Sequence, residues 1–276
     1  MPDDRAIGVF DSGIGGLTVL AALSRQLPGE SLIYLGDTAR VPYGTRSPRT
    51  VLRYACQVAD ALVSRDVKAM VVACNTATTH ALDALQETGE ALGIPVFGVI
   101  TPGVQEALAS TRSGHVAVLG TEGTVRGGRY QALLQRAGAT ASAVACPLFV
   151  SLAEEGWHDG EIAELVARRY LQDLPTQPDT AILGCTHYPL LRPAIAAALP
   201  GVTLVDSATA TARVVSQSLA AQGLLGSGLA PTTRFLVTDN LERFHRVGTR
   251  FLGRPPEPME LIDLVLGAGP FSERAA

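Results

Sequence analysis

Short apolar runs alternate along the chain with longer stretches in which apolar residues recur every three or four positions. The short runs predict buried strands, and the longer stretches predict helices. The first pair is a strand over residues 7–10 and a helix over residues 17–27. Because this order repeats, the pattern is typical of an α/β protein with mostly parallel sheets.

The same alternation extends over most of the chain. Further strands are predicted at residues 32–35, 71–73, 95–98, 116–119, 141–145, 180–183, 202–205 and 235–238. Further helices are predicted at residues 48–65, 76–92, 159–174, 207–222 and 241–252, and another begins near residue 101. The tail after Gly267 shows neither pattern, so we expect it to be surface or frayed chain.

Two segments share one local pattern, in which an apolar strand ends at a small residue followed by a cysteine. VVACNT contains Cys74 and ILGCTH contains Cys185. The offset of about 110 residues is far longer than the roughly 20 to 50 residues of a solenoid repeat. Ligands bind at the carboxyl ends of strands in open α/β sheets. The sequence therefore predicts two pseudo-symmetric three-layer α/β domains with the active site in the cleft between them.

Two matched thiols on opposite sides of a substrate suggest racemisation or epimerisation at a carbon acid. One group removes a proton from one face of the carbon, and the other returns a proton to the opposite face. A thiol with an ordinary pKa near about 8.5 can serve as donor or acceptor after modest tuning. The alternative is that both cysteines are small core residues, but their matched position at strand ends favours the chemical role.

Composition excludes several classes of function. The formal net charge of −4 and a pI near 5.7 argue against a nucleic-acid surface. No apolar run is long enough for a membrane span, and the first residues lack the pattern of an export signal. Four cysteines without CxxC or zinc spacing fit reduced thiols, so we expect a cytoplasmic protein.

Cofactor chemistry is also disfavoured. Lys68 is the only lysine, and it precedes the strand that leads to Cys74, so it should lie at the far end of the sheet from the cleft. A pyridoxal phosphate enzyme needs a lysine at the reacting centre. The glycines after Asp11 do not have GxGxxG spacing, which leaves dinucleotide binding weakly supported, and a Cys-x-His pair alone is a poor metal site. We therefore expect no cofactor and no metal.

Six motifs in order, FDSGIGGL, GDTARVPYG, ACNTAT, LGTEGTV, GCTHYPLL and VDSA, resemble the cofactor-independent aspartate/glutamate racemase family. The resemblance spans nearly the whole chain, and the PYG and THYPLL segments favour glutamate over aspartate. It implies one domain from residues 1–98 plus 208–276 and another from residues 99–207. It also implies interconversion of L- and D-glutamate, a supply of D-glutamate for peptidoglycan, and assembly as a homodimer.

The resemblance also assigns roles to single residues. Cys74 and Cys185 match the two acid/base thiols, Asp11 and His187 match the residues that tune them, and Glu154 matches a further assistant near Cys185. The matched substrate-binding positions are Asp11, Ser12, Tyr43, Gly44, Asn75, Thr76, Thr121, Thr186 and His187.

The sequence departs from the family pattern in two places. Thr78-Thr79 replaces small residues, and Thr238-Asp239-Asn240 replaces the usual Ser-Gly-Asp. Neither segment includes a matched catalytic position, so the departures concern local packing or the contact between subunits.

Three other functions stay open. One is racemisation of aspartate or a related amino acid by the same chemistry. Another is a thiol hydrolase that uses a cysteine with His187, which a trapped acyl-enzyme would identify. The last is a two-domain binding protein without catalysis, which would bind its ligand without exchanging the α-proton.

Overall fold

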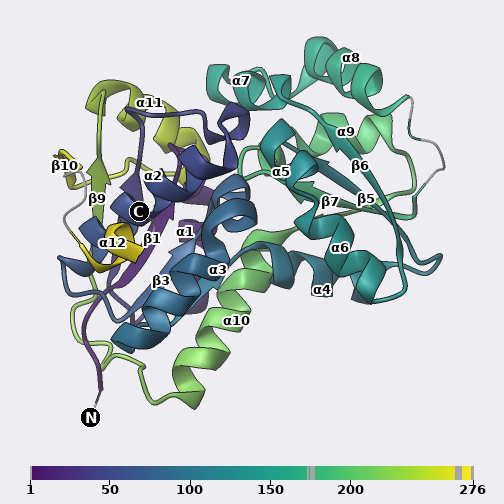
Figure 1. Cartoon of the computed structure of the whole chain (residues 1–276). Helices are drawn as coiled ribbons and strands as arrows, with labels where there is room; N and C mark the ends of the chain where they lie inside the picture. The colour runs from purple at the N-terminus through teal and green to yellow at the C-terminus, as the bar shows by residue number, and fades with distance from the viewer. Residues whose placement is uncertain (1, 173, 175–177, 265–268, 275–276) are drawn as a thin grey trace.

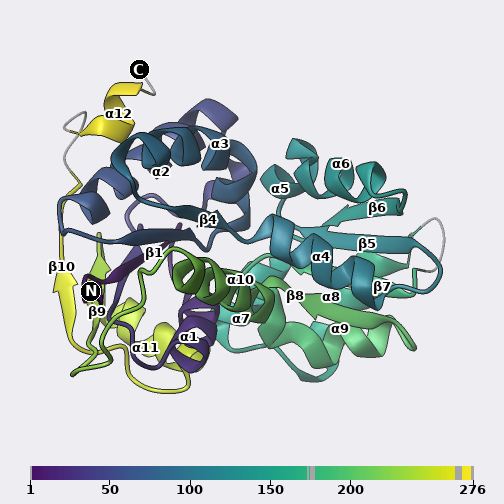
Figure 2. The same ribbon diagram turned by 90° about the horizontal axis from the view of Figure 1, so that it is seen from below.

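The strands form two separate sheets, each with parallel pairings. The structure, a computed structural model, describes residues 2–172, 174, 178–264 and 269–274. The first sheet has the order β10-β9-β2-β1-β3-β4 and the second the order β6-β5-β7-β8. Helices cover both sheets, and the two α/β domains lie side by side (Figures 1 and 2). The predicted fold class is confirmed.

The elements of the first domain come from both ends of the chain. Its strands are β1 (Ile7–Asp11), β2 (Leu32–Gly36), β3 (Ala69–Val72), β4 (Val96–Gly98), β9 (Thr233–Val237) and β10 (Met259–Leu261). Its helices are α1 (Leu17–Gln26), the short 3-10 helix η1 (Tyr43–Thr45), α2 (Pro48–Val63), α3 (Asn75–Leu92), α10 (Ser207–Ala221), α11 (Leu241–Leu252) and α12 (Pro270–Arg274).

The second domain lies in the middle of the chain. Its strands are β5 (His115–Gly120), β6 (Thr140–Ala145), β7 (Thr180–Gly184) and β8 (Thr203–Asp206). Its helices are α4 (Ile100–Ser110), α5 (Glu122–Gly127), α6 (Arg129–Arg136), α7 (Leu148–Glu155), α8 (Gly160–Leu171), the 3-10 helix η2 (Tyr188–Leu191) and α9 (Arg192–Ala198).

The two sheets share one internal order. The sequence β2-β1-β3-β4 in the first sheet recurs as β6-β5-β7-β8 in the second, so β3 and β7 occupy equivalent places. Cys74 and Cys185 follow these two strands. Because parallel strands end at the same edge of a sheet, this order puts each cysteine at the ligand-binding edge of its own domain.

Two segments connect the domains. The chain enters the second domain through α4 and leaves it through α10, which packs against both α1 and α4 (Figure 2). The largest cluster of buried apolar residues is continuous across the domains and includes Leu17 and Val247 from the first and Phe149 and Tyr188 from the second. The residue limits given above for the two domains stay a prediction.

The C-terminal tail differs from the expected frayed chain where the structure describes it. Within it, α12 buries Phe271 to 1% exposure. Strand β10, which lies before this tail and pairs with β9, was also not predicted. The backbone N–H groups of Phe271 and Ser272 donate to the Asp60 carboxylate, which caps this short helix. A single apolar residue in a short helix gives no periodicity, so the sequence pattern missed it.

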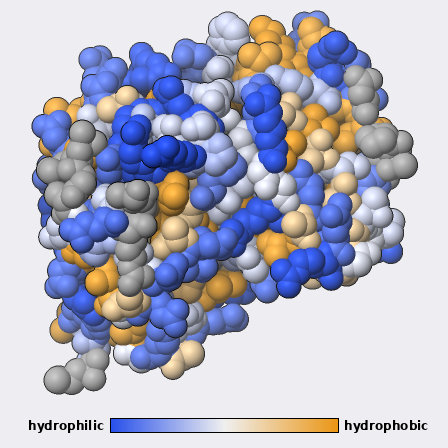
Figure 3. Space-filling model, viewed as in Figure 1, coloured by the Kyte–Doolittle hydropathy of each residue, from blue (hydrophilic) through white to orange (hydrophobic). Residues whose placement is uncertain are grey.

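The surface in Figure 3 is mostly polar, with apolar residues gathered towards α7 and α8. There Trp157, Ile162 and Leu165 are each more than half exposed. In the described part of the chain, no helix has both the length and the apolar character needed to cross a membrane. The homodimer stays a prediction.

Candidate active site

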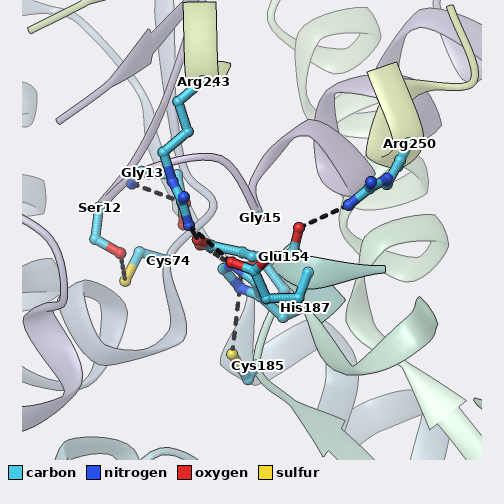
Figure 4. Close-up of polar contacts among 12 residues, drawn as sticks. Ser12, Gly13, Gly15, Cys74, Glu154, Cys185, His187, Arg243 and Arg250 are labelled. Carbon is cyan, nitrogen blue, oxygen red and sulfur yellow. Dashed lines mark hydrogen bonds and ion pairs between the residues drawn. The ribbon is translucent and has the colours of Figure 1, made fainter. Parts of the chain in front are cut away.

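The two matched cysteines lie at equivalent positions and are both buried. Cys74 is the N-cap residue of α3, and its sulfur accepts a hydrogen bond from the backbone N–H of Ala77 at 3.4 Å. Cys185 directly follows β7 and precedes η2. The side chains are 5% and 7% exposed, respectively. The two thiols are close enough to interact electrostatically, and Figure 4 shows them with the residues around them.

Cys74 lies beside Asp11, the last residue of β1, and Ser12, which follows it. Its thiol donates to the hydroxyl of Ser12 at 3.6 Å. The Asp11 carboxylate is buried, and its Oδ2 accepts from the backbone N–H of Gly13 at 3.1 Å. Burial raises the pKa of Asp11, although the charge of His187 and the N–H groups of Gly16 and Gly13 oppose this. Burial, with the Asp11 carboxylate adding to it, raises the pKa of Cys74 to about 12. Cys74 is therefore a neutral thiol.

Cys185 lies beside a charged pair. The Nδ1 atom of His187 is 3.8 Å from its sulfur, and the Nε2 atom donates to Glu154 Oε1 at 3.0 Å. Burial opposes a charged imidazole, but hydrogen bonds to Cys185 and Glu154 outweigh it and raise the pKa of His187 to about 10. Burial likewise favours a neutral Glu154, yet His187 and Arg243 hold the pKa of this carboxyl below its usual value. His187 is therefore an imidazolium near neutral pH.

A cluster of hydroxyls joins the domains near Cys74. Thr76 at the start of α3 and Thr121, the N-cap residue of α5, place their Oγ1 atoms 2.9 Å apart. Thr124, which belongs to the same LGTEGTV motif, contacts both hydroxyls at 3.3 and 3.1 Å. Gly44 packs directly on Thr121, since a Cβ at residue 44 would lie 2.8 Å from the Thr121 Cβ. These donors can bind a carboxylate.

Asn75 is held in place by a residue that the sequence did not identify. The hydroxyl of Tyr130, on α6, donates to Asn75 Oδ1 at 2.7 Å, so the amide nitrogen of Asn75 is free to act as a donor elsewhere. This contact joins α3 to the second domain. No local signal marks Tyr130, because it depends on the packing of two distant helices.

Tyr43 does not join the cluster through its hydroxyl. The side chain is 1% exposed and donates to Asp37 Oδ2 at 2.5 Å. Arg40 also pairs with this carboxylate at 2.7 Å. Any contact of residue 43 with a ligand would involve its backbone, and its role in substrate binding stays a prediction.

Thr186 and His187 pack tightly against the loop after β1. A Cβ at residue 15 would overlap Thr186 Oγ1 and His187 Nδ1, so only glycine fits there. The hydroxyl of Thr18 donates a hydrogen bond to the backbone oxygen of Thr186 at 3.3 Å. Gly15 thus brings the first domain into contact with the residue that neighbours Cys185.

Residues interpreted as structural have structural partners. Lys68 is buried at the amino end of β3 and forms an ion pair with Glu30 at 2.5 Å. His80 contacts the backbone oxygen of Gly123 at 3.0 Å, and Cys56 and Cys146 are buried. Within the described ranges, no three His, Cys, Asp or Glu side chains come together as a metal site.

Helix α11 contributes to the Cys185 side, which the sequence did not suggest. Arg243 donates to Glu154 Oε2 at 2.8 Å, and Arg250 donates to the Glu154 backbone oxygen at 2.8 Å (Figure 4). The ring of Phe251 meets His187 edge-on, with centroids 5.1 Å apart. A helix that follows β9 of the first sheet therefore surrounds Glu154 and His187 of the second domain.

The arrangement provides a proton donor and a proton acceptor on facing domains. Cys74 carries a proton, whereas Cys185 faces an imidazolium that can stabilise a sulfur anion. Hydroxyl and amide donors lie beside both, in a region shielded from water. Such a site can move a proton onto one face of a bound carbon acid and off the other.

Comparisons with known proteins bear on this chemistry. The family model described as Asp/Glu/Hydantoin racemase matches residues 7–215. A glutamate racemase from Geobacter metallireducens is 53% identical over 258 residues, which is 90% of this chain and 93% of that protein.

Solved structures show the same fold. The glutamate racemase of Francisella tularensis, crystallised in complex with D-glutamate, superposes with a TM-score of 0.89 at 40% identity, covering 95% of this chain and 98% of that one. An aspartate racemase from Picrophilus torridus has a TM-score of 0.55 at 15% identity, covering 79% of this chain and 94% of its own, and shares the fold alone.

Proposed function

This chain belongs to the Asp/Glu/Hydantoin racemase family, and from that premise we propose that it interconverts L- and D-glutamate without a cofactor. The observation that carries the proposal is the pair of buried thiols at equivalent strand ends of two facing domains. The relative from Francisella tularensis, which matches 95% of this chain, was crystallised with D-glutamate, and this supports glutamate as the substrate.

The proposed reaction uses Cys185 and Cys74 as the two bases. For one enantiomer, the Cys185 thiolate removes the α-proton, and the Cys74 thiol donates its own proton to the opposite face of the carbon. The product is the other enantiomer, and Cys185 now holds the proton while Cys74 is the thiolate. The opposite enantiomer reacts by the reverse transfers.

The α-proton of an amino acid is weakly acidic, so the site must stabilise the carbanion that forms. We assign this role to donors aimed at the substrate carboxylates, which are the hydroxyls of Ser12, Thr76, Thr121 and Thr186 with the amide of Asn75. Such donors stabilise developing charge most effectively where water is excluded. Asp11 on one side and His187 with Glu154 on the other would adjust the two thiols.

The biological role follows from the proposed reaction. D-glutamate would supply peptidoglycan synthesis in the cytoplasm, and the substrate is a small molecule rather than a nucleic acid or a membrane. A homodimer is part of the same proposal.

The direct test is incubation of the purified, pyridoxal-free protein with L-glutamate in D2O under reducing conditions. The loss of the α-proton signal by NMR and the change in optical rotation report exchange and racemisation separately. We expect both, with D-glutamate as the product. If neither occurs with glutamate but both occur with aspartate, the substrate assignment is wrong and the chemistry stands.

A further inference from the structure

One ion pair joins the first domain to the proton carrier of the second. Glu154 lies on α7, beside the second sheet, and Arg243 lies on α11, which follows β9 of the first sheet. The Nη2 atom of Arg243 is 2.8 Å from Glu154 Oε2, and the other carboxylate oxygen accepts from His187. The carboxylate therefore has one oxygen bound to each domain.

The same helix contacts Glu154 and His187 at two further points. Arg250 donates to the backbone oxygen of Glu154, and Phe251 lies against the His187 ring. Gly156, with φ of +81°, leaves room for the Arg250 guanidinium, which a Cβ there would meet at 3.0 Å. These contacts restrict both the position of Glu154 and the plane of the imidazole.

The start of α11 fixes the position of Arg243. Asn240 is its N-cap residue, with a φ of 52°, and its side chain accepts from the backbone N–H of Arg243 at 3.0 Å. Asn tolerates this left-handed conformation better than most residues. The cap therefore fixes the backbone of Arg243 in the first turn of α11.

We propose that Arg243 is a positioning residue for the Cys185 proton carrier. It holds Glu154 ionised and oriented, and Glu154 in turn holds the His187 imidazolium against the Cys185 sulfur. Because the arginine belongs to the first domain, this carrier is complete only when the two domains are in contact. Cys74 has its partners, Ser12 and Asp11, within its own domain and needs no such link.

The groups that face His187 come from four elements. Asp11 approaches from the end of β1, Glu154 from α7, Cys185 from the end of β7, and Arg243 acts through Glu154 from α11. Glu155 is a weaker partner of the arginine at 3.8 Å. Asp11, Glu154 and Cys185 favour the imidazolium, whereas the positive charge of Arg243 by itself opposes it. The arginine can therefore support the imidazolium only by holding Glu154 in place.

The test is a titration of the 15N-labelled histidines by NMR, with His187 assigned from a His187→Asn variant. In the wild-type protein we expect His187 to keep its proton to a pH near 10, and this raised pKa means that the imidazolium is lost only as the pH rises through that value. In Arg243→Met we expect the midpoint to fall by about 0.5 to 1 unit, because Glu154 is no longer held against His187. Loss of the arginine's positive charge alone would raise the midpoint, so a fall reports the positioning role. Glu154→Gln should lower it by about 1 to 3 units.

Two variants serve as controls. Arg246→Met removes the same charge from an exposed site on the same helix and should leave the midpoint unchanged. Arg243→Lys keeps a cation that can still pair with Glu154 and should recover part of the shift. An unchanged or raised His187 midpoint in Arg243→Met, or an equal fall in Arg246→Met, would overturn the proposal.

Turnover adds an independent readout, which rests on the proposed glutamate racemisation. In Arg243→Met we expect kcat to fall by about threefold to tenfold with KM nearly unchanged, and the alkaline loss of kcat to begin at lower pH. An alkaline limb at the wild-type pH would count against the proposal. The NMR titration needs no substrate, so a protein that fails to racemise glutamate can still confirm or refute the role of Arg243.

Discussion

The surroundings of Cys74 and Cys185 differ although their places in the two sheets are equivalent. Cys74 caps a long helix and lies beside a carboxylate, Asp11, whose charge disfavours the thiolate. Cys185 precedes a short 3-10 helix and lies beside an imidazolium, His187, which pairs with Glu154 and through it with Arg243. The repeated topology thus presents two thiols alike, while a carboxylate lies beside one and an imidazolium beside the other.

This difference suits a reaction that needs one thiol and one thiolate at rest. Two identical environments would leave both sulfurs in the same protonation state, and one of the two transfers would then lack its partner. The asymmetry comes from Asp11 at the end of β1, from Glu154 on α7 and from α11, and not from the equivalent strands β3 and β7. Two domains with the same strand order can therefore place their cysteines alike and still surround them with different residues.

The strongest test of the comparison removes one sulfur at a time. We expect Cys74→Ser and Cys185→Ser each to lower racemisation by about a thousandfold or more, because one proton transfer loses its carrier. Each variant should still exchange the α-proton of one enantiomer in D2O, and the enantiomer should differ between them. Proton NMR with L- and D-glutamate measures this, with Cys146→Ala as the control. Wild-type racemisation by both variants would refute the two-thiol mechanism.

A weaker effect on kcat is expected when the residues beside the two thiols are substituted. His187→Asn and Asp11→Asn should each reduce kcat by about a hundredfold, since each removes the group that tunes one carrier. The isotope effect with α-deuterated substrate should rise for one enantiomer in His187→Asn and for the other in Asp11→Asn. Equal changes with both enantiomers in either variant would mean that the two sides do not act separately.

The smallest effect is expected at Gly15, which contacts only the Cys185 side. In Gly15→Ala, the added methyl group must displace Thr186 and His187, and we expect kcat/KM to fall by about tenfold through misplacement of these residues. Gly13→Ala, on the same loop, is the matched control because its Cβ meets only the flexible side chain of Val41. Equal losses in both variants would show that the loop, and not the contact with His187, is responsible.

Local patterns in the sequence were sufficient to locate the two thiols. Each cysteine follows a buried strand and a small residue, and strand direction alone then places it at the ligand-binding edge. Asp11 and His187 are near in sequence to a strand end, so the motif resemblance could assign them. In the structure both cysteines follow the ends of their strands, while the chemical roles stay proposals.

Contacts between segments that are distant in the chain could not be predicted from the sequence. The amphipathic pattern predicted α11 with its observed limits, but periodicity does not show which of its charged residues will meet another domain. Arg243, Tyr130 and Thr124 act through partners that lie far away in the chain. The sequence marked Asn240 only as part of a departure from the family pattern. In the structure it is the N-cap residue of α11.

The burial of the four cysteines also allows two kinds of motion to be distinguished by chemical labelling. Cys74 and Cys185 lie between the domains and are almost inaccessible, so an alkylating reagent can reach them only while the domains are apart. Cys56, on α2, and Cys146, directly after β6, are 2% and 0% exposed, and we expect labelling there to require local unfolding. At saturating reagent, the difference in labelling rates between the two pairs therefore separates the opening that admits substrate from the loss of the fold itself.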